Sequence, residues 1–194
     1  MRSFTYSLFA LFAAIAAMCS LCTDAAAQRR DFVNEQEADL IREFQEVDAR
    51  IELLMKFIDR RLAAAGVPGH NWTPPKKNAE LWGEEPAGTR PELLYDAKRI
   101  LQKAVDDIDD IASRTAAAIE GNEKSGKLFP KAVRNLSAAA RRFKPIFQAE
   151  LAKATNEKEK GVLFDSIELC DQIVEAAANL PKEPTKEEKK KAKN

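Results

Sequence analysis

The stretch that decides the fold is residues 89–115, which read TRPELLYDAKRILQKAVDDIDDIASRT. Thr89 and Glu92 have the spacing of a capping box, in which two side chains satisfy free backbone N–H groups at a helix start, and Pro91 is tolerated in the first turn. Small or apolar residues then recur at steps of three and four, at Leu94, Ala97, Leu101, Ala104, Ile108, Ile111 and Thr115. This periodicity predicts one amphipathic helix that ends at Gly121.

The segment before this helix has a similar pattern. Asn34 and Glu37 repeat the capping-box spacing, and residues 28–65 contain neither Gly nor Pro. The stripe that follows is Leu40, Phe44, Val47, Ile51, Leu54 and Ile58. We therefore expect one long helix that ends near Ala65, before Gly66.

Two more helices are expected towards the C-terminus. The third, from about Pro130 to Ala154, has a stripe of Val133, Leu136, Ala140, Phe143 and Phe147, and residues 121–129 before it are expected to form a polar loop. The fourth begins with a capping-box spacing at Asn156 and Glu159 and has a stripe of Leu163, Ile167, Cys170, Val174 and Ala177.

Four amphipathic helices with these spacings predict an all-α fold, specifically an antiparallel four-helix bundle over residues 28–180. The connection between the first and second helices, residues 66–89, has a different composition. It holds four of the seven Gly, four of the nine Pro, both Trp and the only His. A connection of this length is typically either functional or disordered.

The two ends of the chain differ in composition from the bundle. Residues 1–27 contain Arg2, an uncharged run from Leu8 to Met18 and a small-residue site at Ala25-Ala26-Ala27, which is typical of a signal peptide cut near Gln28. An uncleaved membrane anchor is the alternative. Cleavage predicts an exported protein, periplasmic or extracellular, with no stable membrane insertion. Residues 181–194 have the composition of a disordered Lys-rich tail.

Composition excludes several classes of function. The 31 Lys plus Arg balance the 31 Asp plus Glu, whereas a general nucleic-acid binder needs an excess of bases to displace phosphate counterions, so we expect no nucleic-acid partner. A single His cannot supply the Glu-x-x-His motifs of a di-iron bundle. Cys170, the only Cys beyond the predicted leader, falls on the fourth stripe and is expected to be a buried small hydrophobe.

The connection at 66–89 supplies the candidate residues for binding a partner, His70, Trp72 and Trp82. Trp is enriched at interfaces because it buries a large apolar area and also has an indole N–H that can donate a hydrogen bond. The alternative is that both indole rings fold back and cap the end of the bundle.

An acidic group on the second helix supplies a candidate metal site. Asp106, Asp109 and Asp110 share one helical face, and carboxylate oxygens are the ligands of hard cations. The alternative is a solvated face, because Arg114 lies four residues after Asp110, at ion-pair spacing.

No catalytic constellation or cofactor motif can be singled out, so we expect neither an enzyme nor a resident cofactor. The first hypothesis is a non-enzymatic exported bundle that binds a protein partner, or itself, through the Trp-bearing connection and exposed helix faces. The second is a small-molecule or metal-binding bundle that uses the acidic group or a pocket between helices. An enzyme whose carboxylates cannot be identified from sequence is the third.

The signal-peptide hypothesis makes a direct prediction. Mass spectrometry of the exported protein should find a first residue near Gln28 and no peptide from residues 1–22. An intact N-terminus in a membrane fraction would instead show that the leader is retained as an anchor.

Overall fold

The structure is a computed structural model that describes residues 31–115 and 123–180. The predicted leader and the Lys-rich tail lie outside these residues. Within the described part there are five α-helices, one short 3₁₀ helix and no strand, so the all-α prediction is confirmed. None of the helices in this part is both long enough and apolar enough to cross a membrane.

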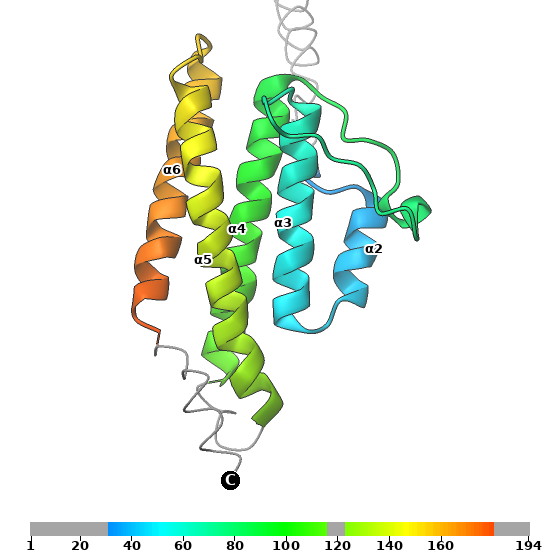
Figure 1. Cartoon of the computed structure of the whole chain (residues 1–194), viewed down its shortest axis with the longest axis vertical. Coiled ribbons are helices and arrows are strands. Elements are labelled where there is room, and N and C mark those ends of the chain that lie inside the picture. The colour runs from blue at the N-terminus through cyan, green and yellow to red at the C-terminus, as the bar shows by residue number, and fades with distance from the viewer. Residues whose placement is uncertain (1–30, 116–122, 181–194) are drawn as a thin grey trace, which may run out of the picture. The chain divides into compact units, whose positions relative to one another are not determined.

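The helices differ in length and position along the chain (Figure 1). Their bounds are α2 Glu35–Glu43, α3 Val47–Ala64, η1 Ala79–Trp82, α4 Arg90–Thr115, α5 Glu123–Leu151 and α6 Glu157–Ala178.

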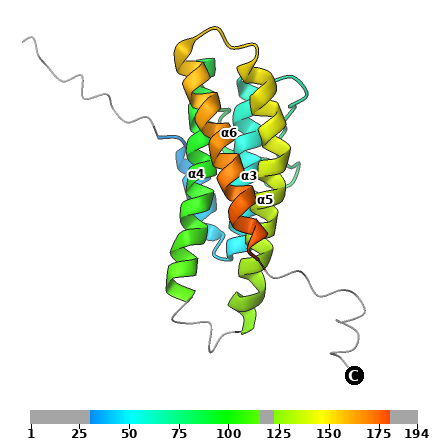
Figure 2. The ribbon, with the colours of Figure 1, turned by 90° about the vertical axis from the view of Figure 1, so that its left-hand side faces the viewer.

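Each of the four long helices packs against two principal neighbours. α3 packs against α4 and α5, and α6 packs against the same two helices from the other side (Figure 2). Fully buried side chains from all four fill the space between them, among them Phe57, Leu101, Phe143, Phe147 and Leu163. The short helix α2 lies outside this group, against α3 and η1.

The prediction of a single helix over residues 34–65 is wrong. α2 ends at Glu43, and the backbone of the next residue, Phe44 (φ −80°, ψ 88°), is not helical. Glu46 is extended, and α3 begins directly after it. Arg50 Nε donates a hydrogen bond of 2.9 Å to the Phe44 carbonyl and so stabilises the break. The described residues therefore contain five α-helices where four were expected.

The third helix also differs from the prediction, because α5 begins at Glu123 and continues through both Pro130 and Pro145. Residues 123–129 were expected to form a loop. Leu128 and Phe129 are half-buried and pack against the core, and we attribute the additional helical turns to this burial. The predicted end of the second helix at Gly121 lies outside the described residues.

The three predicted capping boxes differ in completeness. Asn34 and Glu37 form both hydrogen bonds of the box, as expected. Glu92 accepts a hydrogen bond of 2.7 Å from the Thr89 backbone N–H. Asn156 caps α6, but the Glu159 carboxylate pairs with Arg90 at 2.9 Å.

Arg90 joins the ends of four helices. Arg90 is the first residue of α4. It donates hydrogen bonds to the carboxylates of Glu159, near the start of α6, and Glu150, near the end of α5. It also donates one of 2.8 Å to the carbonyl of Ala65, just after α3. Burial alone would raise the pKa of Glu150, but hydrogen bonds from Lys153 and Arg90 outweigh it and hold that pKa below its ordinary value. This cluster stabilises the fold near neutral pH, and the stabilisation is lost as the pH falls through the lowered pKa of Glu150.

A buried ionic cluster joins α2, α3 and the connection at 66–89. The Glu37 carboxylate is fully buried and accepts hydrogen bonds of 2.7 Å from Arg60 Nη1 and from Arg61 Nη1, and one of 2.5 Å from Arg61 Nη2. Arg61 Nε also lies 4.0 Å from the buried carboxylate of Asp96 on α4. We call these four residues the Glu37 cluster, in which two acids balance two bases.

The Glu37 cluster also fastens the connection to α3. Arg60 donates hydrogen bonds to the backbone carbonyls of Trp82 (2.7 Å), Gly83 (3.1 Å) and Glu84. Arg61 donates to the carbonyl of Phe32 at 2.8 Å, just before α2. Two adjacent Arg side chains on α3 therefore hold both the segment that precedes it and the segment that follows it.

We predict that Glu37→Ala lowers the free energy of unfolding by about 3–5 kcal/mol, because it leaves two buried guanidinium groups without their shared carboxylate. Chemical denaturation followed by circular dichroism measures this loss. Glu35→Ala is the matched control, since Glu35 is exposed in the same helical turn and its removal should cost about 0.5 kcal/mol. Equal losses in the two variants would show that the Glu37 cluster does not determine stability.

Candidate functional site

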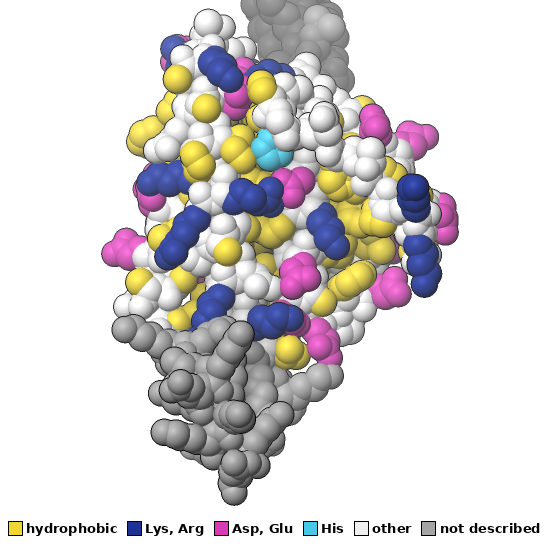
Figure 3. All heavy atoms as spheres, viewed as in Figure 1, with side chains coloured by type: hydrophobic (Ala, Val, Ile, Leu, Met, Phe, Trp, Pro, Cys, Tyr) yellow, Lys and Arg dark blue, Asp and Glu magenta, His cyan; other side chains and the backbone are white. Residues whose placement is uncertain are grey.

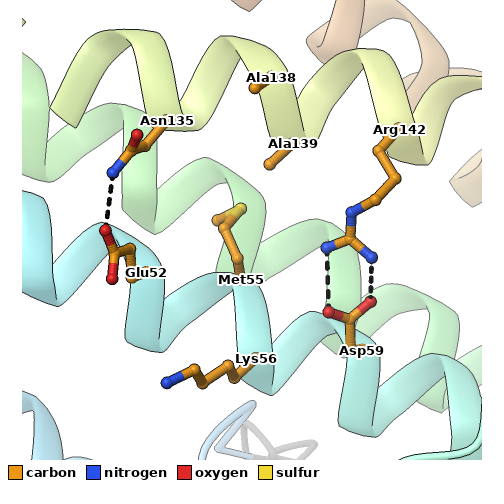
Figure 4. A pocket seen from close by; sticks show the side chains of 8 residues that line it. All are labelled: Glu52, Met55, Lys56, Asp59, Asn135, Ala138, Ala139 and Arg142. Carbon is orange, nitrogen blue, oxygen red and sulfur yellow. Dashed lines mark hydrogen bonds and ion pairs between the residues drawn. The ribbon is translucent and has the colours of Figure 1, made fainter. Parts of the chain in front are cut away.

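Two hollows lie next to each other on the outer surface of α3. The first, about 450 Å³, lies between α3 and α5 (Figure 4). Met55 from α3 and Ala138 and Ala139 from α5 supply its apolar surface. Its polar lining residues are Glu52, Lys56, Asp59, Asn135 and Arg142.

The second hollow, about 260 Å³, lies between α2, α3 and the connection. Glu52 and Lys56 line both hollows, so the two are adjacent and we call them together the α3 face. The other lining residues of the second hollow are Leu40, Glu43, Phe44, Ala49, Leu53, Pro75, Lys77, Asn78, Leu81 and Trp82.

The α3 face combines exposed apolar side chains with depressions. Four large hydrophobic side chains of the described part are exposed, and two of them, Phe44 (37%) and Leu81 (41%), line the second hollow. Figure 3 shows hydrophobic side chains gathered in the middle of this side of the bundle, with charged groups around and between them. A concentration of this kind differs from the scattered single hydrophobic residues of an ordinary surface.

Two polar pairs cross the first hollow from α3 to α5 (Figure 4). Arg142 donates two hydrogen bonds to the Asp59 carboxylate, at 2.7 and 2.9 Å, and Asn135 donates one of 2.9 Å to Glu52. The ring of His70, with Nδ1 3.6 Å from Asp59 Oδ1, lies beside the first of these pairs. These contacts hold the two walls of the hollow at a fixed separation.

The charges of the α3 face are balanced. Its lining contains three acids, Glu43, Glu52 and Asp59, and three bases, Lys56, Lys77 and Arg142. Asp59 and Arg142 neutralise each other. No described residue forms an ion pair with Glu43, Lys56 or Lys77, so both signs of charge are available to a partner.

The three candidate residues for partner binding, His70, Trp72 and Trp82, differ in how deeply they are buried. Trp82 is buried, with 6% of its surface exposed, and its ring packs edge-to-face on Phe57 at 5.5 Å between centroids. Trp72 is half-buried, 5.0 Å from Trp82, and the Arg60 guanidinium lies 5.1 Å from its ring centroid. Trp82 is therefore part of the core, and it also lines the second hollow.

His70 and Trp72 line a third hollow of about 320 Å³, between the C-terminal end of α3 and the connection. Arg60 and Glu85 also line it. The Arg60 guanidinium is already bonded to Glu37 and to backbone carbonyls, and it is only 2% exposed. The exposed charge of this hollow is therefore that of Glu85, and the hollow has fewer apolar side chains than the α3 face.

The candidate metal residues lie on the exposed surface of α4. Asp106 accepts a hydrogen bond of 2.9 Å from Gln102, and Asp110 forms an ion pair with Arg114 at 2.9 Å. Asp109 is exposed as well. Over the described residues, no three His, Cys, Asp or Glu side chains are grouped closely enough to hold a metal ion.

In the described part, Asp48, Lys131 and Cys170 each have a pKa that is shifted further from neutral pH. A hydrogen bond from Lys131 holds the pKa of Asp48 below its ordinary value, and the same contact raises the pKa of Lys131. Burial raises the pKa of the Cys170 thiol to about 12, which keeps it protonated and unreactive. The shifts of Asp48 and Lys131 accompany a structural ion pair, whereas catalysis typically uses groups with a pKa near the working pH.

Of the residues that line the α3 face, the sequence indicates only Trp82 as a candidate for binding. Phe44 was assigned to the core stripe of a continuous helix, and Leu81 was not singled out. Ala138 and Ala139 leave the first hollow open because their side chains are small, but nothing in the sequence shows that no larger neighbour covers them. The composition of residues 66–89 was the one available signal, since five residues of that connection line the second hollow.

Comparison of this chain with protein-family models, with curated proteins and with solved structures finds no match. The function is therefore argued from the geometry and chemistry of the surface itself.

We predict that Trp82→Ala lowers the free energy of unfolding by about 3–5 kcal/mol, the cost of removing a large buried aromatic side chain. Trp72→Ala should cost only about 1 kcal/mol, because its half-buried ring loses mainly its contacts with Arg60 and Trp82. Urea denaturation of the two variants measures the difference. A larger loss for Trp72→Ala than for Trp82→Ala would contradict the core position of Trp82.

Proposed function

We propose that the protein is an exported, non-enzymatic helical-bundle protein that binds a protein partner through the α3 face. In this proposal α3, α4, α5 and α6 form the antiparallel four-helix bundle predicted from the sequence. α2 is an added helix that, together with the connection at 66–89, builds one side of the binding surface.

The observation that carries the proposal is the position of Phe44 and Leu81. Both are large, both are more than a third exposed, and both line one hollow that continues into another with an apolar floor. Exposing such side chains to water is unfavourable, by roughly 25 cal/mol per Å² of apolar surface. A protein partner that covers the α3 face would remove this cost.

The shape of the α3 face favours a protein over a small molecule. Small-molecule sites are typically deep and bury most of the ligand surface. The first hollow is bounded by only two helices and lies open on the surface (Figure 3). A broad surface with an apolar centre and a polar rim is the usual anatomy of a protein interface.

The proposal predicts position-dependent crosslinking in the cells that naturally produce the protein. A photo-activated amino acid at Ala138, which is exposed in the first hollow, should form a covalent adduct with the partner. The matched control carries the same amino acid at Ala176, an exposed Ala on α6, a helix that makes no contact with α3. Circular dichroism of both variants checks that the fold is retained.

An adduct at position 138 together with its absence at position 176 supports the proposal. Absence of an adduct at position 138, or equal adducts at both positions, would show that the α3 face is not a binding surface. The mass of the adduct gives the size of the partner.

A further inference from the structure

We propose that the partner that covers the α3 face is a second copy of this chain, in a two-fold dimer in which the α3 faces of the two copies pack together. The inference rests on the proposed function and adds the identity of the partner. Two-fold pairing is the commonest symmetry of soluble oligomers, and it requires one surface that is complementary to itself.

The charges of the α3 face meet this requirement. A surface that selects a strongly charged partner carries an excess of one sign, whereas this one has equal numbers of acids and bases. Lys56 and Lys77 have no ion-pair partner among the described residues, and neither has Glu43. In a two-fold dimer the acid of one copy can lie opposite a base of the other, and each pairing occurs twice.

The shape of the α3 face also suits pairing with a second copy, because it carries both protruding apolar side chains and a hollow. Phe44 and Leu81 are exposed at the second hollow, and the first hollow beside it is floored by Met55, Ala138 and Ala139. A two-fold axis between Glu52 and Lys56, which both line both hollows, would place the second hollow of one copy over the first hollow of the other, with Lys56 of each copy near Glu52 of the partner copy. The exposed apolar side chains of each copy would then fill the space above the small Ala residues of its partner.

The other exposed hydrophobic side chains do not offer an equivalent surface. Phe164 on α6 is 62% exposed and Tyr95 on α4 is 43% exposed, but neither lines any of the three hollows. Single exposed hydrophobic residues are common on monomeric proteins. On the α3 face, by contrast, two exposed apolar side chains lie beside two hollows.

The experiment is sedimentation equilibrium of the purified protein over micromolar to millimolar concentrations. We expect a monomer–dimer equilibrium in the parent protein. Ala138→Arg, which places a bulky charge in the first hollow, should weaken the dimer at least about tenfold. Ala176→Arg introduces the same side chain on α6 and should leave the dimer unchanged.

Exchanging charges on the α3 face tests the electrostatic pairing between the two copies without adding a bulky side chain. Lys56→Glu gives the α3 face an excess of acids and should weaken the dimer. Adding Glu43→Lys to it restores the charge balance and should recover part of the lost affinity. Both residues are exposed on helix surfaces, so the fold should be retained, and circular dichroism of each variant checks this.

Several results would overturn the inference. A monomer at every concentration excludes the dimer, and a dimer that Ala138→Arg does not weaken forms through another surface. In either case a photo-crosslinked adduct at position 138 with a different protein would leave the proposed function standing. Absence of any adduct at that position would contradict both the dimer and the proposed function.

Discussion

The buried carboxylate of Glu37 is the group on which the arrangement of this protein depends. Glu37 and Arg60 are 23 residues apart, and in one continuous helix they would be separated by about 35 Å. The structure places their side-chain atoms 2.7 Å apart, which is possible only because the chain reverses between α2 and α3. Burying charged groups is costly, so a cluster of this kind specifies one arrangement more than it adds stability.

The same cluster determines what lies beside α3. Arg60 holds the backbone at Trp82, Gly83 and Glu84, and this places η1 against α2. Gly83 has φ +63°, and a Cβ atom there would lie 2.8 Å from the side-chain oxygen of Gln36. Only glycine therefore allows the connection to approach α2 so closely. The second hollow of the α3 face is a consequence of this approach, since its walls are α2 and the connection.

Local patterns in the sequence predicted the helical class and most helix starts. The capping residues Asn34 and Asn156 directly precede α2 and α6, because capping depends on neighbours within one turn. The break at Phe44 was missed because Phe44 keeps the spacing of the stripe through the break. The reversal of the chain there brings Glu37 to the two Arg side chains, a long-range contact that no local pattern reveals.

The candidate surface was less predictable than the fold. Residues 66–89 were identified as unusual from their composition, and two of the three candidates in them, Trp72 and Trp82, pack against each other. The hollows themselves depend on which side chains remain uncovered after folding. Which side chains stay exposed is decided by how the helices pack together, and it cannot be predicted from the sequence pattern of α3 or α5 alone.

The burial of Cys170 has a consequence for the redox chemistry of the chain. With its pKa raised to about 12 by desolvation, and by the charge of Asp171 next to it, almost none of this thiol is ionised at neutral pH. Disulfide exchange and alkylation both require the thiolate. An oxidising compartment would therefore leave Cys170 reduced. In the proposed mature chain, which lacks residues 1–27, a single cysteine introduced on the surface would therefore be the one reactive thiol.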